Sequence, residues 1–198
     1  MRKGERTRQF ILEQAAEVFN RKGYEGSSMS DLTEATKIQK GGIYRHFESK
    51  EQLALEAFQF AFRRASEARY REPQPGETQM QVLRGFLARW VDPTGPLVPG
   101  GCPILNTAVD ADDGNELLLE AVQRELGGWV DRLAGHIQKG IDSGEFVAAD
   151  ATAVANFVIG SLEGALMISR VQRDREVLRR CADFLGDWLE RELTLQTL

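Results

Sequence analysis

Cysteine and histidine are scarce in this sequence. Of 198 residues two are Cys and two are His, and Cys102 and Cys181 lie far apart without metal-ligand spacing, so neither a disulfide framework nor a zinc site is expected. No nucleophile motif, phosphate-binding glycine loop or metal-ligand pair accompanies His46 and His136. The sequence therefore argues against an enzyme, and no cofactor is predicted.

Long apolar runs are also missing from the sequence pattern. No stretch approaches the roughly 20 apolar residues that cross a bilayer. Residues 1–8, MRKGERTR, lack the apolar segment of a signal peptide. We therefore expect no membrane association and a cytoplasmic location.

The composition that is present is that of a folded protein with an uneven charge. Hydrophobic residues make up 42% and charged residues 28%, which argues against disorder. Net charge is -5, yet residues 1–50 carry 10 Lys/Arg against 7 Asp/Glu, whereas residues 51–198 carry 15 against 23. A locally basic start permits contact with DNA phosphates even on an acidic protein.

Hydrophobic periodicity is helical almost throughout, and no alternating run indicates a strand. The predicted fold class is all-α. The expected helices cover residues 7–21, 29–36, 40–47, 49–70, 78–91, 103–110, 115–142, 150–171 and 174–192.

Turn and loop residues divide the chain. The segment 73–76, PQPG, is the best linker, and 92–101 is a Pro/Gly-rich loop. We predict a DNA-binding domain at 1–48, a connecting helix at 49–72, and a larger helical sensing and dimerisation domain at 73–198.

Two short helices around a tight turn lie near the N-terminus. Ser28 with Asp31 forms one predicted capping box, and Ser49 with Gln52 forms a second. Residues 37–39 make the turn between the two short helices. Short helices braced by longer ones are typical of a helix-turn-helix.

The run from Ser28 to Leu53 resembles the N-terminal domain of the TetR family. Its most specific part is GGIYRHF at 41–47 followed by SKEQL at 49–53, and the resemblance is close over 5–58. It implies an all-helical homodimer that binds pseudo-palindromic operator DNA and responds to a small molecule. Family resemblance alone favours a repressor over an activator.

The predicted DNA-binding residues belong to this run. Gln and Lys at the start of a recognition helix can bond to bases, glycines permit close approach, and the resemblance points to Tyr44 and Lys50 as phosphate anchors. Each residue taken alone is more typical of a solvated surface, whereas together in this frame they favour contact with DNA. The set is Ser28, Gln39, Lys40, Gly41, Gly42, Tyr44, His46 and Lys50. Ile43 and Phe47 are expected to face inward against Phe19 and Leu32.

Two positions depart from the family pattern. Lys37 replaces a usual Gly and must adopt a left-handed backbone or reshape the turn. Gln39 replaces a usual Ser and is a poorer helix cap. The basic residues Arg2, Lys3, Arg6 and Arg8 form either an arm over a groove or a solubilising tail.

The last two helices carry broad apolar stripes. Val177, Cys181, Phe184 and Trp188 alternate at spacings of four and three, and Gly160 and Gly164 permit close helix approach. The pair forms either half of an intermolecular four-helix bundle or an internal core pair, and the resemblance implies the bundle.

Residues that could sense an effector are spread over the second half. A pocket between helices is one interpretation and ordinary core is the other. The candidates are Phe86, Trp90, Cys102, Asn106, Trp129, Leu133 and Phe157. Cys102 lies in the segment GGCPILN at 100–106, which resembles that of TetR branches with electrophile-responsive repressors, and its place at a helix start would favour a thiolate. Burial as a small apolar residue is the alternative.

Two further functions compete with a ligand-responsive repressor. One is a helical interaction protein with a vestigial DNA-binding head, and the other is a TetR-like activator. Sequence-selective DNA binding that weakens steeply with salt separates a regulator from the interaction protein.

Overall fold

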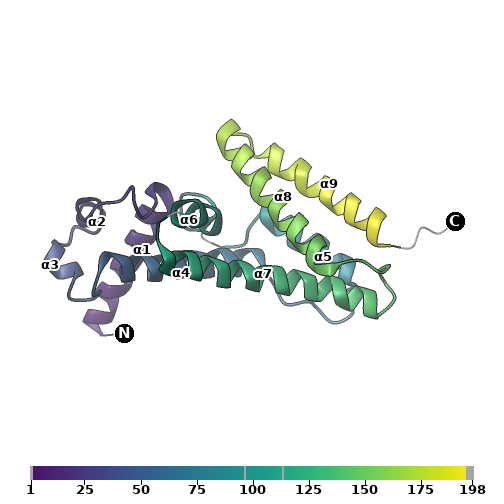
Figure 1. The fold of residues 1–198 in the computed structure, drawn as a ribbon, viewed down its shortest axis with the longest axis horizontal. Coiled ribbons are helices and arrows are strands. Elements are labelled where there is room, and N and C mark those ends of the chain that lie inside the picture. The colour runs from purple at the N-terminus through teal and green to yellow at the C-terminus, as the bar shows by residue number, and fades with distance from the viewer. Residues whose placement is uncertain (1, 96, 113, 195–198) are drawn as a thin grey trace. The chain divides into compact units, whose positions relative to one another are not determined.

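The computed structural model describes residues 2–95, 97–112 and 114–194, and over these ranges the regular secondary structure is entirely helical (Figure 1). The helices are α1 (Lys3–Lys22), α2 (Met29–Thr36), α3 (Lys40–Ile43), α4 (Lys50–Arg69), α5 (Gln79–Val91), α6 (Pro103–Ala111), α7 (Glu116–Asp142), α8 (Ala151–Gln172) and α9 (Glu176–Leu193). The all-α prediction is confirmed.

Most helix ends match the sequence prediction, and two differ. α1 begins at Lys3, so most of the predicted basic arm is the first turns of a helix. α3 ends at Ile43 rather than Phe47, because Gly41 and Gly42 are poor helix formers. The chain continues as a turn in which Phe47 N donates to Ile43 O at 3.2 Å.

The chain divides into two compact units, which we call the head unit and the body unit. The head unit is Met1–Ser66 with Pro96–Glu125, and the body unit is Glu67–Gly95 with Leu126–Leu198. Two of the boundaries between the units lie within helices, one in α4 and one in α7. The head unit thus contains α1 to α3 together with α6, although α6 is distant in sequence.

The core of the head unit is one apolar cluster beneath the short helices. Its buried members are Ile11, Leu12, Ala15, Ala16, Leu32, Ile43, Phe47, Leu53, Ala57, Phe60 and Ala61. Ile43 and Phe47 are each 1% exposed, and Phe19 packs against the same cluster. We call residues 39–47 the recognition segment. The prediction that its Ile43 and Phe47 face inward is confirmed.

In the body unit α9 packs against both α5 and α8, and α8 and α9 run side by side in Figure 1. The Arg84 side chain of α5 donates to Glu190 at 2.7 Å and to Asp187 at 3.0 Å on α9. Leu185 and Leu189 of α9 are buried against these neighbours. Apolar burial and a double ion pair therefore fix α9 in place.

The composition of α8 bears on the expectation that no segment crosses a membrane. The helix has 22 residues and a mean hydropathy of 1.5 over its most apolar window, so by length and composition alone it could cross a membrane. Glu163 and Arg170 interrupt its apolar sequence, so it contains no uninterrupted apolar run of membrane-spanning length. Only 28% of that window is buried, and the exposed residues of α8 include the large apolar Phe157, Met167, Ile168 and Val171.

Candidate nucleic-acid interface

Ser28 fixes the start of α2. Its hydroxyl accepts from Asp31 N at 3.2 Å, and its own N–H donates to the Asp31 carboxylate at 2.7 Å, which is the predicted capping box. The Lys22 ammonium also binds the Asp31 carboxylate, and this hydrogen bond with Lys22 is the main reason that the pKa of Asp31 lies well below its usual range. The structure therefore gives Ser28 a capping role, and a DNA contact from it stays a prediction.

The turn between α2 and α3 is built around Thr36 and Lys37. The buried Thr36 hydroxyl donates to Leu32 O at 2.7 Å and accepts from Ile38 N at 3.2 Å. Lys37 has φ 57 and ψ 21, the left-handed conformation, which is the first of the two alternatives that the sequence left open. Gln39 begins α3 without a side-chain cap, so the expectation of a poorer cap is confirmed.

The two glycines of α3 have different surroundings. A Cβ on Gly42 would lie 2.7 Å from Ile38 Cγ2, whereas a Cβ on Gly41 would meet nothing within 4 Å. Gly42 is therefore required by packing within the head unit. Gly41 is exposed, and because it has no side chain the solvent-facing side of α3 is open at this position.

The outer side of the recognition segment is polar. Gln39, Lys40, Gly41 and Arg45 are exposed, and Tyr44 is 37% exposed. The Lys40 ammonium lies 5.8 Å from the centre of the Tyr44 ring. The hydrogen-bond donors of these polar side chains therefore face away from the core.

Two further basic side chains, those of His46 and Lys50, flank these exposed residues. His46 is half-buried, and its backbone N–H donates to Ile43 O at 2.9 Å. Lys50 lies 4.1 Å from the Tyr24 ring centre and donates to Tyr24 O at 2.6 Å, so it links α4 to the loop before α2. The sequence prediction did not include Arg45, although its basic side chain between Tyr44 and His46 was a signal that could have identified it.

Arg8 has a structural partner that sequence did not indicate. Its guanidinium donates to both Glu56 carboxylate oxygens, at 2.7 and 2.6 Å, and lies 4.5 Å from the Phe47 ring centre. Arg8 therefore joins α1 to α4 and covers the end of the recognition segment. It does not belong to a free arm.

Two of the predicted sensing residues, Cys102 and Asn106, lie in the head unit. Cys102 is 1% exposed and precedes α6. The Asn106 amide donates to Asn20 O at 2.8 Å, Asn20 Oδ1 at 3.0 Å and Gly100 O at 3.0 Å, and Asn20 in turn donates to Pro99 O at 3.1 Å. This set, Asn20, Gly100 and Asn106, is called the asparagine clamp below, and it ties α6 to the C-terminal end of α1.

The predicted aromatic residues lie in the body unit. Trp90 and Trp129 are 2% and 8% exposed and meet edge to face with ring centres 5.8 Å apart. The edge of Phe86 meets Trp90 at 6.3 Å, and the Arg69 guanidinium lies 4.3 Å from the Trp90 ring. Leu133 is buried at 5% exposure.

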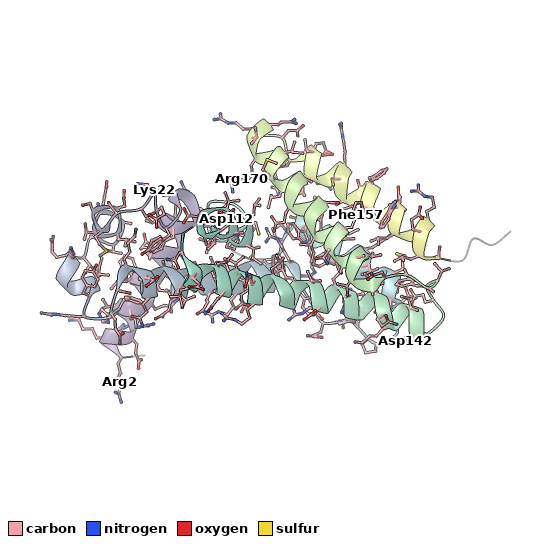
Figure 2. The ribbon with its side chains drawn as sticks, viewed as in Figure 1. Arg2, Lys22, Asp112, Asp142, Phe157 and Arg170 are labelled. Carbon is pink, nitrogen blue, oxygen red and sulfur yellow. The ribbon has the colours of Figure 1, made fainter. Side chains whose placement is uncertain are left out.

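Phe157 is the exception among these candidates. It is 50% exposed on α8, and its ring centre is 4.8 Å from that of Trp188 on α9 (Figure 2). The expectation that Phe157 lines a pocket with the two tryptophans is therefore not supported. Periodicity could not tell which of the two apolar sides of α8 is covered.

The head unit thus presents a helix-turn-helix with a buried apolar side and an exposed polar side. Residues 11–57 match bacterial regulatory proteins of the tetR family, and residues 80–185 match the tetracyclin repressor-like C-terminal domain. The chain belongs to the TetR family. This TetR-family chain is a helix-turn-helix transcription regulator and not an enzyme, as the sequence predicted.

Relatives of this TetR-family chain match it along most of its length. The HTH-type transcriptional repressor DhaR of Mycobacterium sp. (strain GP1) is 29% identical over 178 residues, which cover 86% of each protein. A TetR transcriptional regulator from Chloroflexus aurantiacus J-10-FL is 37% identical with a TM-score of 0.87, covering 98% of this chain and 100% of that one. A TetR-family regulator from Cytophaga hutchinsonii is 33% identical with a TM-score of 0.82, covering 100% and 99%.

Proposed function

We propose that this chain is a cytoplasmic, homodimeric repressor that binds a pseudo-palindromic operator and releases it when a small molecule binds. The observation that carries the proposal is the exposed run of Gln39, Lys40, Gly41 and Tyr44 above the buried Ile43 and Phe47. The similarity to DhaR, a repressor by name, favours repression over activation.

We assign the contacts by chemistry. Gln39 and Lys40 read base edges in the major groove, where Gln suits adenine and Lys suits guanine. Tyr44, His46 and Lys50 hold phosphates, which positions the head without specifying sequence. Lys50 retains donors for this role beyond the one given to Tyr24 O.

The exposed side of the α8–α9 pair supports a dimer. Large apolar side chains stand out from it, and a Cβ on Gly160 or Gly164 would meet nothing within 4 Å. They are Phe157, Met167, Ile168, Val171 and Phe184, with exposures of 50%, 48%, 41%, 76% and 65%. An apolar surface of this kind marks an interaction site, and a second copy of the chain would place two heads on two half-sites.

We place effector recognition at the tryptophan pair of the body unit. Among the described residues, the buried indole N–H of Trp90 has no hydrogen-bond partner. A buried donor without an acceptor costs roughly 1–3 kcal/mol, so an effector that brings a carbonyl or carboxylate oxygen would remove this cost. Arg69, stacked on Trp90, is the last residue of α4.

We assign Cys102 and Asn106 to coupling and packing within the head unit. Cys102 is 1% exposed, and a thiol must be accessible to react. If Cys102 were nonetheless an electrophile sensor, Cys102→Ser would abolish release of DNA by thiol-reactive compounds while preserving DNA binding.

Fluorescence anisotropy with DNA from upstream of the chain's own gene, and with sequences selected from random DNA, tests the proposed function. We expect selective binding that weakens steeply with salt, and a large loss of affinity for the double variant Gln39→Ala/Tyr44→Ala. Gln123→Ala, on the exposed side of α7, serves as control. Absence of selectivity with both DNA sources would replace the repressor by the interaction-protein alternative.

A further inference from the structure

Lys37 has a backbone conformation that does not suit its side chain. Among the described non-glycine residues, Lys37 and Arg173 are the two with positive φ, at 57 and 55. A Cβ crowds the backbone in this region, whereas glycine has no such cost. A lysine at this position therefore needs a benefit that outweighs the strain.

The interactions within the head unit do not supply that benefit. Lys37 is exposed, and it lines a shallow hollow that also contains Asp31 and Glu34. Asp31 is already bound by Lys22 and by Ser28. Among the described residues no ion pair joins Lys37 to either acid.

The location of Lys37 points to a partner outside the chain. Lys37 separates α2 from α3 and comes directly before Ile38, whose neighbour Gln39 begins the exposed run. A recognition helix enters the groove by its N-terminal residues, so the turn before it lies near the edge of the groove, where phosphates are found. A long, flexible lysine suits such a contact better than glycine can.

We propose that Lys37 binds a backbone phosphate of operator DNA and that this interaction is what maintains a lysine in a left-handed position. The inference rests on the proposed function. It adds Lys37 to the phosphate contacts already proposed for Tyr44, His46 and Lys50. The competing explanation is that its charge serves only the C-terminus of α2, whose dipole attracts cations, or the nearby acids.

The test is the salt dependence of operator affinity for Lys37→Asn, measured by anisotropy from about 50 to about 200 mM salt. Asparagine tolerates the left-handed backbone and removes the charge, so the turn is preserved. The slope of log K against log salt changes by about 0.9 for each phosphate that the protein no longer neutralises. With one such phosphate for each of two subunits, the slope of the variant should be shallower by about 1.8, with several-fold weaker binding at low salt.

Arg173→Asn is the matched control, because Arg173 has the same conformation at the end of α8 in the body unit. It should leave the slope unchanged. Lys37→Arg should also keep the slope of the unaltered chain. Lys37→Gly should show the same shallower slope as Lys37→Asn while raising the melting temperature through relief of strain.

The alternatives give different results. An unchanged slope in both Lys37→Asn and Lys37→Gly, with selective binding by the unaltered chain, would overturn the phosphate anchor and leave the repressor intact. Absence of selective binding by the unaltered chain would overturn the proposed function, and this inference with it.

Discussion

The recognition segment of the head unit and the α8–α9 pair of the body unit distribute their large apolar residues in opposite ways. In the former, Ile43 and Phe47 are each 1% exposed and the outer side is polar. In the latter, Val171 and Phe184 are 76% and 65% exposed. A short helix cannot hold itself together, so its apolar residues are all used for anchoring. Long helices retain an apolar side that remains available for a partner.

The largest effect is expected from the buried aromatic residue. Phe47→Ala should lower the free energy of unfolding by about 3–5 kcal/mol, because it leaves a cavity in a cluster that closes the head unit. Phe184→Ala should have little effect on the unfolding of the isolated subunit. Urea unfolding of both variants at a subunit concentration low enough to dissociate dimers checks the difference, and equal losses of stability would remove the distinction between the two surfaces.

A charge on the exposed apolar side of the α8–α9 pair should dissociate the proposed dimer without unfolding the chain. Val171→Glu would bury a carboxylate between subunits, and we expect the dimer dissociation constant to rise about 100-fold, which is about 2.7 kcal/mol. Sedimentation velocity measures the change, and operator affinity should fall with it. Val109→Glu provides the control, since Val109 is 69% exposed on α6. A dimer that survives Val171→Glu would assign this surface to another partner.

Two glycines sharpen the comparison further. A Cβ on Gly100 would lie 2.6 Å from Asn20 O, and Gly100 has φ 125, so Gly100→Ala should destabilise the head unit by roughly 1–3 kcal/mol. A Cβ on Gly164 meets nothing within 4 Å, so Gly164→Ala should stabilise the subunit slightly through helix propensity. Thermal melts of both variants measure these changes in stability. An unchanged melting temperature for Gly100→Ala would show that the asparagine clamp rearranges at little cost in free energy.

The smallest effect is expected from a change of pH, which should alter the stability of the body unit through His136. His136 is buried in the body unit, with Nδ1 3.0 Å from Gln79 Oε1, and its burial lowers its pKa, helped by Lys139. The pKa of His136 is lower in the folded protein than in the unfolded protein. Such a group contributes stability that is fully present above its unfolded pKa of about 6.5 and is lost as pH falls toward its folded pKa. The melting temperature should therefore fall from pH 7 to pH 5, and less so for His136→Gln. A decline of equal size in both proteins would point to other groups.

Much of the fold follows from local rules. Ser28, Thr78 and Asp150 accept hydrogen bonds at the starts of α2, α5 and α8, and such caps with helical periodicity predict helix ends from sequence alone. The left-handed Lys37 was one of two alternatives that followed from its replacing a usual Gly of the family pattern. These features depend on neighbours in the chain.

The features that sequence did not predict depend on distant partners. Arg8 meets Glu56, and Asn20 meets Asn106, through contacts that span much of the head unit's sequence. Hydrophobic periodicity likewise shows that α8 has apolar residues on several sides but not which side a neighbour covers, and so Phe157 was misplaced. The residues proposed to contact DNA could be chosen from sequence because they lie within one continuous segment, and their contacts stay a prediction.

The asparagine clamp has a consequence for recombining heads and bodies among relatives. Residues 97–112, which supply Gly100 and Asn106, belong to the head unit although they follow α5 in the chain. A hybrid joined once, in the linker at 73–76, would pair Asn20 of one parent with the loop of another. Exchange of the complete head unit therefore requires three junctions, close to residues 66, 95 and 125, so that α1 and α6 come from the same parent. Recombination at a single point in this linker should be tolerated only between parents that share Asn20, Gly100 and Asn106.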